Sequence, residues 1–192
     1  MRCVAATELR VFRALGLPGA LFYTHPFHNL CLLCERKRHT VKSCFFIGYH
    51  DAPEYIKPRL VDAVERHITE YGVTEFVVGQ HGAFDLMSAG VLVAVKKKHP
   101  TITLFMLIAY HPSDRAPMLY EGFDAAYYPP GMESVPRSVA IVRANRAAVQ
   151  SSDYLICYDP GYVGNTRNLV EFARRHERRG LLRIENLAEI KK

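Results

Sequence analysis

The stretch F-V-V-G-Q-H-G-A-F-D, residues 76–85, decides how this chain of 192 residues is expected to fold. A short run of aromatic and β-branched residues stops at Gly79, a second glycine follows at Gly82, and an amphipathic pattern begins at Ala83. This order predicts a buried strand, a tight glycine turn and the start of a helix. Such a turn lets backbone N–H groups approach an anion, and the helix dipole favours negative charge there. The alternative to an anion site is a plain turn in which the two glycines are needed only for the backbone geometry.

The alternation of strand and helix patterns continues on both sides of this stretch. Residues 44–48 have the pattern of a buried strand, and a capping box of Asp51 and Glu54 is expected to open the next helix. The almost continuously apolar run 102–108 is typical of a strand whose two sheet faces are both covered by helices. The same patterns predict strands at residues 74–79, 154–158 and 181–184, and helices at about residues 56–71, around residues 87–95, at about residues 138–150 and from residue 169 onward.

This order of elements predicts an α/β fold, a Rossmann-like, doubly wound, mostly parallel sheet in a three-layer αβα sandwich. We place this domain at residues 42–188, followed by a basic tail at residues 189–192. Within the domain, residues 111–136 form a long irregular segment in which a short strand is expected at residues 125–128. So long a loop in a compact domain is usually functional, which predicts a lid or a binding segment.

Residues 1–41 do not follow this pattern. They carry three of the five cysteines and lack a clear period. Residues 14–34 have no formal charge, but their prolines, glycines and histidines argue against a membrane-spanning helix. We interpret residues 1–41 as an N-terminal extension that is either disordered or upstream sequence translated from a misplaced start, with the native protein beginning near Val41. A weaker alternative is a zinc site, although its ligand spacing is unlike that of known sites, at His25, His28, Cys31 and Cys34.

Composition and charge are those of an ordinary soluble globular protein, with 49% hydrophobic and 23% charged residues. The formal net charge of +6 allows a basic face, but Lys and Arg near helix C-termini are also expected for their effect on the helix dipole. Nucleic acid is therefore ranked below a small molecule as the partner. Cys44 and Cys157 lie in apolar strand patterns, which is typical of reduced, buried thiols and predicts a cytoplasmic location. No cofactor and no membrane association are expected.

Three glycine turns follow predicted strands, at residues 48–50, 79–85 and 161–166. Parallel strands share a direction, so all three turns should lie at the carboxyl edge of the sheet, where such folds bind ligands. Their convergence favours a phosphate or nucleotide site, although neither the dinucleotide fingerprint nor a P-loop is present. His50 and His81 are equally expected as plain surface histidines, and Asp85 as a cap of its own helix. The ligand-binding residues predicted from these turns are Gly48, His50, Gly79, His81, Gly82, Asp85, Pro160, Gly161, Gly164, Asn165 and Thr166.

Three runs of the sequence resemble a known family: C-F-F-I-G-Y-H-D, T-E-F-V-V-G-Q-H-G-A-F-D and I-V-R-A-N-R-A-A-V-Q-S-S-D-Y-L-I-C-Y-D. They are similar to the uncharacterised bacterial branch of the SLOG superfamily. These Rossmann-like domains are named for the SMF/DprA DNA-processing proteins and the LOG cytokinin-activating phosphoribohydrolases. The resemblance covers residues 42–188 and implies that a nucleotide or a nucleotide-derived ligand is bound, by a sensor or by an enzyme. It places the first glycine motif of the family on Gly79, Gly82 and Asp85.

The second glycine motif departs from that of the LOG enzymes, which reads P-G-G-x-G-T-x-x-E. Here Tyr162 replaces the second glycine, and Glu171 is the carboxylate nearest to the position of the required glutamate. The resemblance also implies that Arg143 and Arg146, from a basic helix motif, hold a phosphate, although Arg143 could equally form a structural ion pair with Glu133 or Asp153. Because the glutamate is displaced, binding outranks catalysis. The motif falls loosely on Pro160, Gly161, Gly164 and Thr166.

The sequence therefore predicts a sensor or accessory protein that binds a nucleotide or a nucleotide-derived ligand. The first alternative is a nucleoside 5′-monophosphate phosphoribohydrolase, a hydrolase of N-glycosyl bonds whose catalytic candidates are Arg143, Arg146 and Glu171. The second alternative is an accessory protein that binds single-stranded DNA. Both a monomer and a homo-oligomer are compatible with the sequence.

Overall fold

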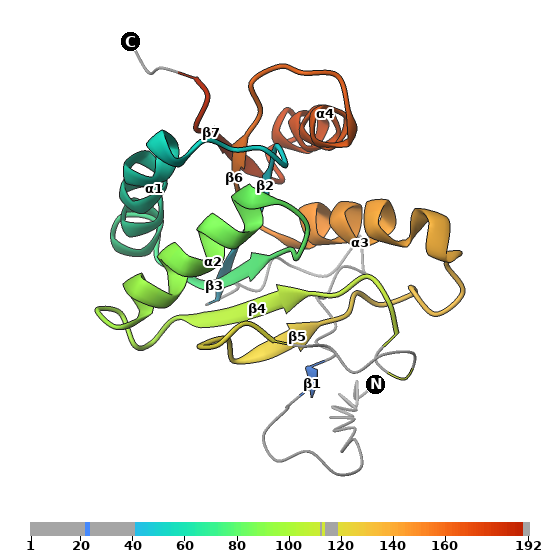
Figure 1. The fold of residues 1–192 in the computed structure, drawn as a ribbon, viewed down its shortest axis with the longest axis horizontal. Coiled ribbons are helices and arrows are strands. Elements are labelled where there is room, and N and C mark those ends of the chain that lie inside the picture. Colours follow the sequence, from blue (N-terminus) through green and yellow to red (C-terminus); the bar gives the residue numbers. More distant parts are fainter. Residues whose placement is uncertain (1–21, 24–40, 112, 114–118, 190–192) are drawn as a thin grey trace, which may run out of the picture.

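The computed structural model describes residues 22–23, 41–111, 113 and 119–189. These residues form one sheet of seven strands in the order β1-β5-β4-β3-β2-β6-β7, and every neighbouring pair is parallel (Figure 1). The predicted fold class, a Rossmann-like doubly wound sheet in a three-layer αβα sandwich, is confirmed. The four residues proposed as zinc ligands lie outside the described residues.

The elements follow the predicted alternation closely. The strands are β1 (Phe22–Tyr23), β2 (Lys42–Gly48), β3 (Val73–Val78), β4 (Thr103–Leu107), β5 (Ala125–Tyr127), β6 (Tyr154–Tyr158) and β7 (Arg183–Asn186). The helices are the 3-10 turn η1 (Glu54–Ile56) and α1 (Lys57–Thr69), α2 (Ala83–Lys96), α3 (Arg137–Ser151) and α4 (Asn165–Glu177).

Two local predictions need correction. The capping box is wrong, because Pro53 precedes the 3-10 turn and no side chain caps it, while the Asp51 carboxylate lies 3.0 Å from Nε2 of His50. The edge strand β1 was not predicted. It lies inside the presumed N-terminal extension, where it pairs Phe22 with Ala126 of β5.

Helices cover both faces of the sheet, as the apolar strands require. Helices α1 and α2 cover one face (Figure 1), and their buried side chains, such as Leu60 and Leu92, pack against it. Buried side chains of α3 and α4, such as Ala144 and Val170, pack against the other face. Among the described residues, no helix combines the length and apolar character that crossing a membrane demands.

The direction in which strands are added reverses between β2 and β6. From β2 the chain adds β3, β4 and β5 on one side, and α3 then carries it back so that β6 and β7 are added on the other side. At this reversal Gly48, the last residue of β2, lies opposite Tyr158, the last residue of β6. Ligands of such sheets bind beyond the carboxyl ends of the strands at this point, so the search for a site begins here.

Candidate functional site

Gly48 at the end of β2 allows α2 to pack directly against this strand. A side chain at this position would place its Cβ 2.1 Å from Cγ of Phe84, whose ring is fully buried in the first turn of α2. The Phe84 ring also stacks on Tyr158, with centroids 6.5 Å apart. Glycine is therefore required at position 48 for close packing.

The turn after β3 closes onto the turn after β2. The N–H of Ala83, the first residue of α2, donates a hydrogen bond of 2.8 Å to the carbonyl of His50. Gly82 has a φ of +123°, and a Cβ there would lie 3.1 Å from Cα of His50. The left-handed backbone and the close approach both select glycine.

The turn after β6 joins the same edge. The Thr166 hydroxyl donates to the carbonyl of Gly48 at 3.1 Å, and the N–H of Tyr49 donates to the carbonyl of Tyr158 at 3.0 Å. The three glycine turns that the sequence predicts at one edge are thus bonded into one continuous surface.

The buried side chain of Asp85 holds the turn after β3 in place through a hydrogen bond. It is 4% exposed, and its carboxylate accepts the backbone N–H of His81 at 2.9 Å. A Cβ on Gly79 would lie 2.5 Å from Oδ2 of Asp85, so this glycine makes room for the carboxylate. Burial away from water raises the pKa of Asp85 to about 7, although the hydrogen bond from His81 acts in the opposite direction.

The loop after β6 has a firmly held base. The buried carboxylate of Asp159 accepts the N–H of Gly161 at 2.9 Å and the guanidinium of Arg167 at 3.0 Å. The Asn186 side chain, from β7, bonds to both backbone groups of Asp159, at 3.0 and 3.1 Å. Pro160 lies between these anchored residues.

The tip of this loop is exposed and carries an aromatic side chain. Tyr162 is 59% exposed, and its ring meets the ring of Tyr49 edge-on, with centroids 5.1 Å apart and an interplanar angle of 66°. Gly161 and Gly164, which flank the tip, have φ values of +94° and +157°. Neither tyrosine was predicted as a site residue. The substitution of Tyr162 for a motif glycine was the one available signal.

The N-terminus of α4 lies directly after this loop. Gly164 is its N-cap, no side chain caps the helix, and Asn165 at its first position is exposed. The first N–H groups of a helix have no acceptor within the helix, and the dipole makes this end attractive to anions. Anionic groups can therefore be held next to Tyr162.

Arg143 and Arg146 lie elsewhere, in a separate pocket of about 540 Å³. Its lining belongs to α3, to Phe172 of α4 and to residues 130–136 rather than to the glycine turns. The guanidinium of Arg146 lies 5.4 Å from the centre of the Phe172 ring, and that of Arg175 lies 5.6 Å from it. Glu171 is half exposed and pairs with Arg167 at 3.2 Å.

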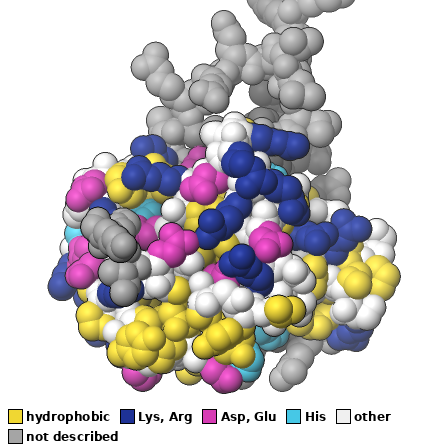
Figure 2. Space-filling model, turned by 90° about the horizontal axis from the view of Figure 1, so that it is seen from above, with side chains coloured by type: hydrophobic (Ala, Val, Ile, Leu, Met, Phe, Trp, Pro, Cys, Tyr) yellow, Lys and Arg dark blue, Asp and Glu magenta, His cyan; other side chains and the backbone are white. Residues whose placement is uncertain are grey.

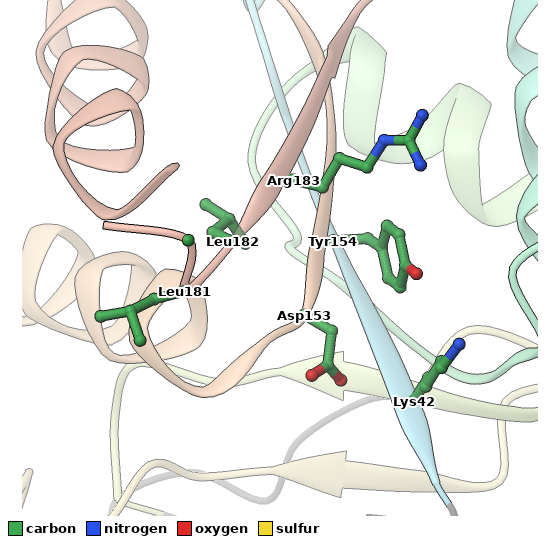
Figure 3. A pocket seen from close by; sticks show the side chains of 7 residues that line it. Lys42, Asp153, Tyr154, Leu181, Leu182 and Arg183 are labelled. Atoms are coloured by element: carbon green, nitrogen blue, oxygen red, sulfur yellow. The ribbon is translucent and has the colours of Figure 1, made fainter. Parts of the chain in front are cut away.

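A smaller pocket of about 210 Å³ opens at the opposite, amino edge of the sheet. Figure 3 shows the side chains of Lys42, Tyr154 and Arg183, the first residues of β2, β6 and β7, on the same side of these strands. Asp153 also lines this pocket, and its carboxylate accepts the backbone N–H of Ser43 at 2.9 Å. The pocket lies at the start of β2, β6 and β7 and is separate from the glycine turns.

Within the described segments, no group of three or more His, Cys, Asp or Glu residues is placed to hold a metal ion.

Comparison with known proteins supports the fold. No family model matches the chain, and neither does any curated protein. DNA processing protein A from Streptococcus pneumoniae is similar, with a TM-score of 0.51 and 12% identity over 71% of this chain and 48% of that chain. For DNA processing protein A from Helicobacter pylori, described for its single-stranded DNA binding mode, the TM-score is 0.49 and the identity 14%, over 71% of this chain and 62% of that chain. The chain thus spans about half the length of the S. pneumoniae protein. At such identities the likeness concerns the Rossmann-like fold alone.

Proposed function

We propose that this protein binds a nucleotide or a nucleotide-derived ligand at the carboxyl edge of its sheet, as a sensor or accessory protein of the SLOG type. The observation that carries the proposal is the joining of three glycine turns at the strand reversal, beside the uncapped N-terminus of α4. This is the place where doubly wound sheets receive phosphate-bearing ligands. The cytoplasmic location stays a prediction from the sequence. A monomer and a homo-oligomer are both compatible with the proposal.

The roles of the site residues follow from this placement. The N–H groups of Asn165 and Thr166 would hold a phosphate, and Gly161 and Gly164 would let it approach the backbone. His50 has a side chain that is 66% exposed and is available to the ligand. Gly48, Gly79 and Gly82 would act indirectly, because they bring the turns together.

The first test is thermal stabilisation by a panel of mono-, di- and cyclic nucleotides. A ligand at about 100 times its dissociation constant adds roughly 2.7 kcal/mol, which for a chain of this size is roughly 5 to 10 °C. Asn165→Asp adds a negative charge that suits a helix N-terminus but repels a phosphate, so the variant should fold normally and lose the shift. Gln150→Glu, the matched change in the pocket beside α3, should keep it.

Two results would contradict this placement. No shift with any nucleotide removes the proposed function. A shift that survives in Asn165→Asp but disappears in Gln150→Glu moves the ligand to the pocket formed by α3 and α4.

Hydrolysis of an N-glycosyl bond has weaker support. The reaction needs a carboxylate close to the leaving base or the attacking water. Glu171 lies on the second turn of α4 and is paired with Arg167. Asp85 is buried beneath the turn after β3. Neither carboxylate is therefore presented to a ligand at the glycine turns. The phosphoribohydrolase alternative therefore stays a prediction from the sequence.

Single-stranded DNA is the second candidate ligand, because α3 and α4 present a basic surface. Figure 2 shows Lys and Arg side chains gathered on the face that includes α4. The pocket beside α3 combines Arg143 and Arg146 with the ring of Phe172, and single strands are held by such cations and stacking surfaces. The likeness in fold to a DNA-processing protein makes DNA the nucleic acid to test first.

A DNA-binding surface predicts strong dependence on salt. Each contact between a cation and a single-strand phosphate contributes about 0.7 to the slope of log K against log salt concentration. The double variant Arg143→Gln and Arg146→Gln should therefore lower that slope by about 1.4 in a fluorescence anisotropy titration with an oligothymidine. The control pair Arg178→Gln and Arg179→Gln, exposed at the end of α4, should change it less. DNA binding whose affinity does not change with salt concentration would argue against a DNA-binding surface on α3 and α4.

A further inference from the structure

We propose that Tyr49 and Tyr162 form an aromatic clamp that takes the nucleobase of the ligand between their rings. The inference rests on the proposed function, because it concerns the same edge of the sheet. It adds what the glycine turns cannot supply. Backbone N–H groups at a helix N-terminus recognise any phosphate, whereas two facing rings recognise a planar aromatic group.

Tyr49 is the fixed wall of the clamp. Its backbone N–H is bonded to Tyr158, and its side chain packs against the core beneath α1 and α2. The His50 ring lies 4.5 Å from the Tyr49 ring and limits its movement further. Below it, Tyr158 stacks on the buried Phe84. A ring held on several sides offers a stacking surface that does not have to be ordered when the ligand binds.

Tyr162 is the movable wall. Tyr162 is 59% exposed and Val163 is fully exposed, so few contacts are lost when the tip of the loop moves. The flanking Gly161 and Gly164 have backbone conformations that other residues rarely adopt, which suits them to act as hinges. The base of the loop stays in place, because the buried carboxylate of Asp159 holds it.

The present spacing of the rings is close to what a clamp requires. The two centroids are 5.1 Å apart and the rings meet at 66°, so Tyr162 presents its edge to the face of Tyr49. A base stacked on both rings needs about 3.5 Å on each side, which separates parallel rings by about 7 Å. An outward movement of about 2 Å and a rotation of Tyr162 are sufficient.

Nothing in the fold requires an aromatic residue at position 162. No residue other than glycine has a positive φ in the described chain, so the backbone conformation at position 162 does not select a particular residue type. Its ring is mostly outside the core. In this sequence it stands where the related LOG motif has glycine, directly before the helix end proposed to hold the phosphate. The geometry thus places base recognition at the tip of the loop and phosphate recognition at the start of α4, within residues 162–166.

Calorimetric titration with AMP, GMP, CMP, UMP and ribose 5-phosphate tests the clamp. Wild-type protein should bind AMP and GMP about tenfold more tightly than ribose 5-phosphate, because each stacked base adds binding energy. Tyr162→Ala should remove most of the preference for AMP over ribose 5-phosphate, since only Tyr49 is left to stack on the base, and leave ribose 5-phosphate affinity unchanged, while Tyr162→Phe should keep the preference. Leu181→Ala is the control, because Leu181 is 57% exposed at the opposite edge of the sheet.

The outcomes separate the clamp from the function on which it rests. Equal binding of ribose 5-phosphate and all four monophosphates overturns the clamp and leaves a phosphate site in place. The clamp is also overturned if Tyr162→Ala weakens AMP and ribose 5-phosphate equally. The ring would then affect binding by holding the loop in shape and not by stacking on the base. If none of the five compounds binds and no nucleotide of the thermal panel gives a shift, the proposed function fails and the clamp fails with it.

Discussion

Replacing Gly48 with alanine is expected to lower the free energy of unfolding by about 3 kcal/mol, at the upper end of what overpacking a core costs. The new methyl group would lie 2.1, 2.4 and 2.6 Å from three carbons of the Phe84 side chain. Phe84 cannot withdraw easily, because its ring is fully buried and stacked on Tyr158. Urea unfolding followed by circular dichroism measures the change through the midpoint at constant slope.

Gly90→Ala is the matched control. Gly90 lies inside α2, is exposed, and a Cβ there meets nothing within 4 Å. Alanine is the better helix former, so this variant should gain about 0.5 to 1 kcal/mol. The opposite signs of two identical substitutions would locate the cost at the contact with Phe84. A Gly48→Ala protein as stable as wild type would show that α2 does not pack on β2 in this way.

The second large effect concerns Asp85 and pH. Burial raises the pKa of Asp85 to about 7 in the folded protein, whereas an aspartate in an unfolded chain titrates near 4. The folded state therefore holds the proton more tightly. The stabilisation that this provides is fully present below about pH 4 and is lost as the pH rises through about 7, by about 4 kcal/mol at most.

Asp85→Asn should remove this pH dependence, because an amide side chain does not titrate. Its oxygen can still accept the N–H of His81, so the turn is expected to keep its hydrogen bond. The stability of Asp85→Asn relative to wild type, compared through urea midpoints, should increase from pH 5 to about pH 7 and level off above that. Taking the difference between the two proteins cancels contributions from other titrating groups, such as the buried His67, whose pKa is lowered by burial. Asp62→Asn, a change in an exposed carboxylate on α1, is the control and should give a nearly constant difference. Parallel curves for Asp85→Asn and wild type would mean that Asp85 does not titrate in this range.

Much of the fold could be predicted because it depends on local patterns. Strands β2, β4 and β6 are short apolar runs bounded by turn residues, and the helices between them carry periodic apolar stripes. The edge strand β1 escaped prediction, because a pairing of two residues leaves no periodic pattern in the sequence. The capping box failed because the helical turn begins after Pro53, two residues beyond Asp51, and proline has no side-chain oxygen to accept the first N–H groups of the turn.

The geometry of the candidate site could be predicted only in part, because its contacts join distant segments. That three turns meet at one edge follows from parallel strands, and the hydrogen bond between Thr166 and Gly48 agrees with it. The contact of Tyr49 with Tyr162 depends on which strands are neighbours, and no local pattern specifies that. The position of Arg143 on α3, in a pocket with Phe172, likewise depends on how α3 packs beside α4. The roles of these residues stay predictions until ligands are tested.

The pairing of β2 with β6 has a consequence for the order in which the protein is assembled. The hydrogen bond from Ser43 to Asp153, at the start of these strands, joins residues 110 positions apart. Contacts between such distant residues form late, because a long stretch of chain must be closed into a loop before the contact stabilises it. On the ribosome, β2, β3, β4 and β5 leave the exit tunnel before β6, and the edge between β2 and β6 cannot exist until then. Ligand binding at that edge would therefore report that synthesis has passed β6 and that the two halves of the sheet have joined.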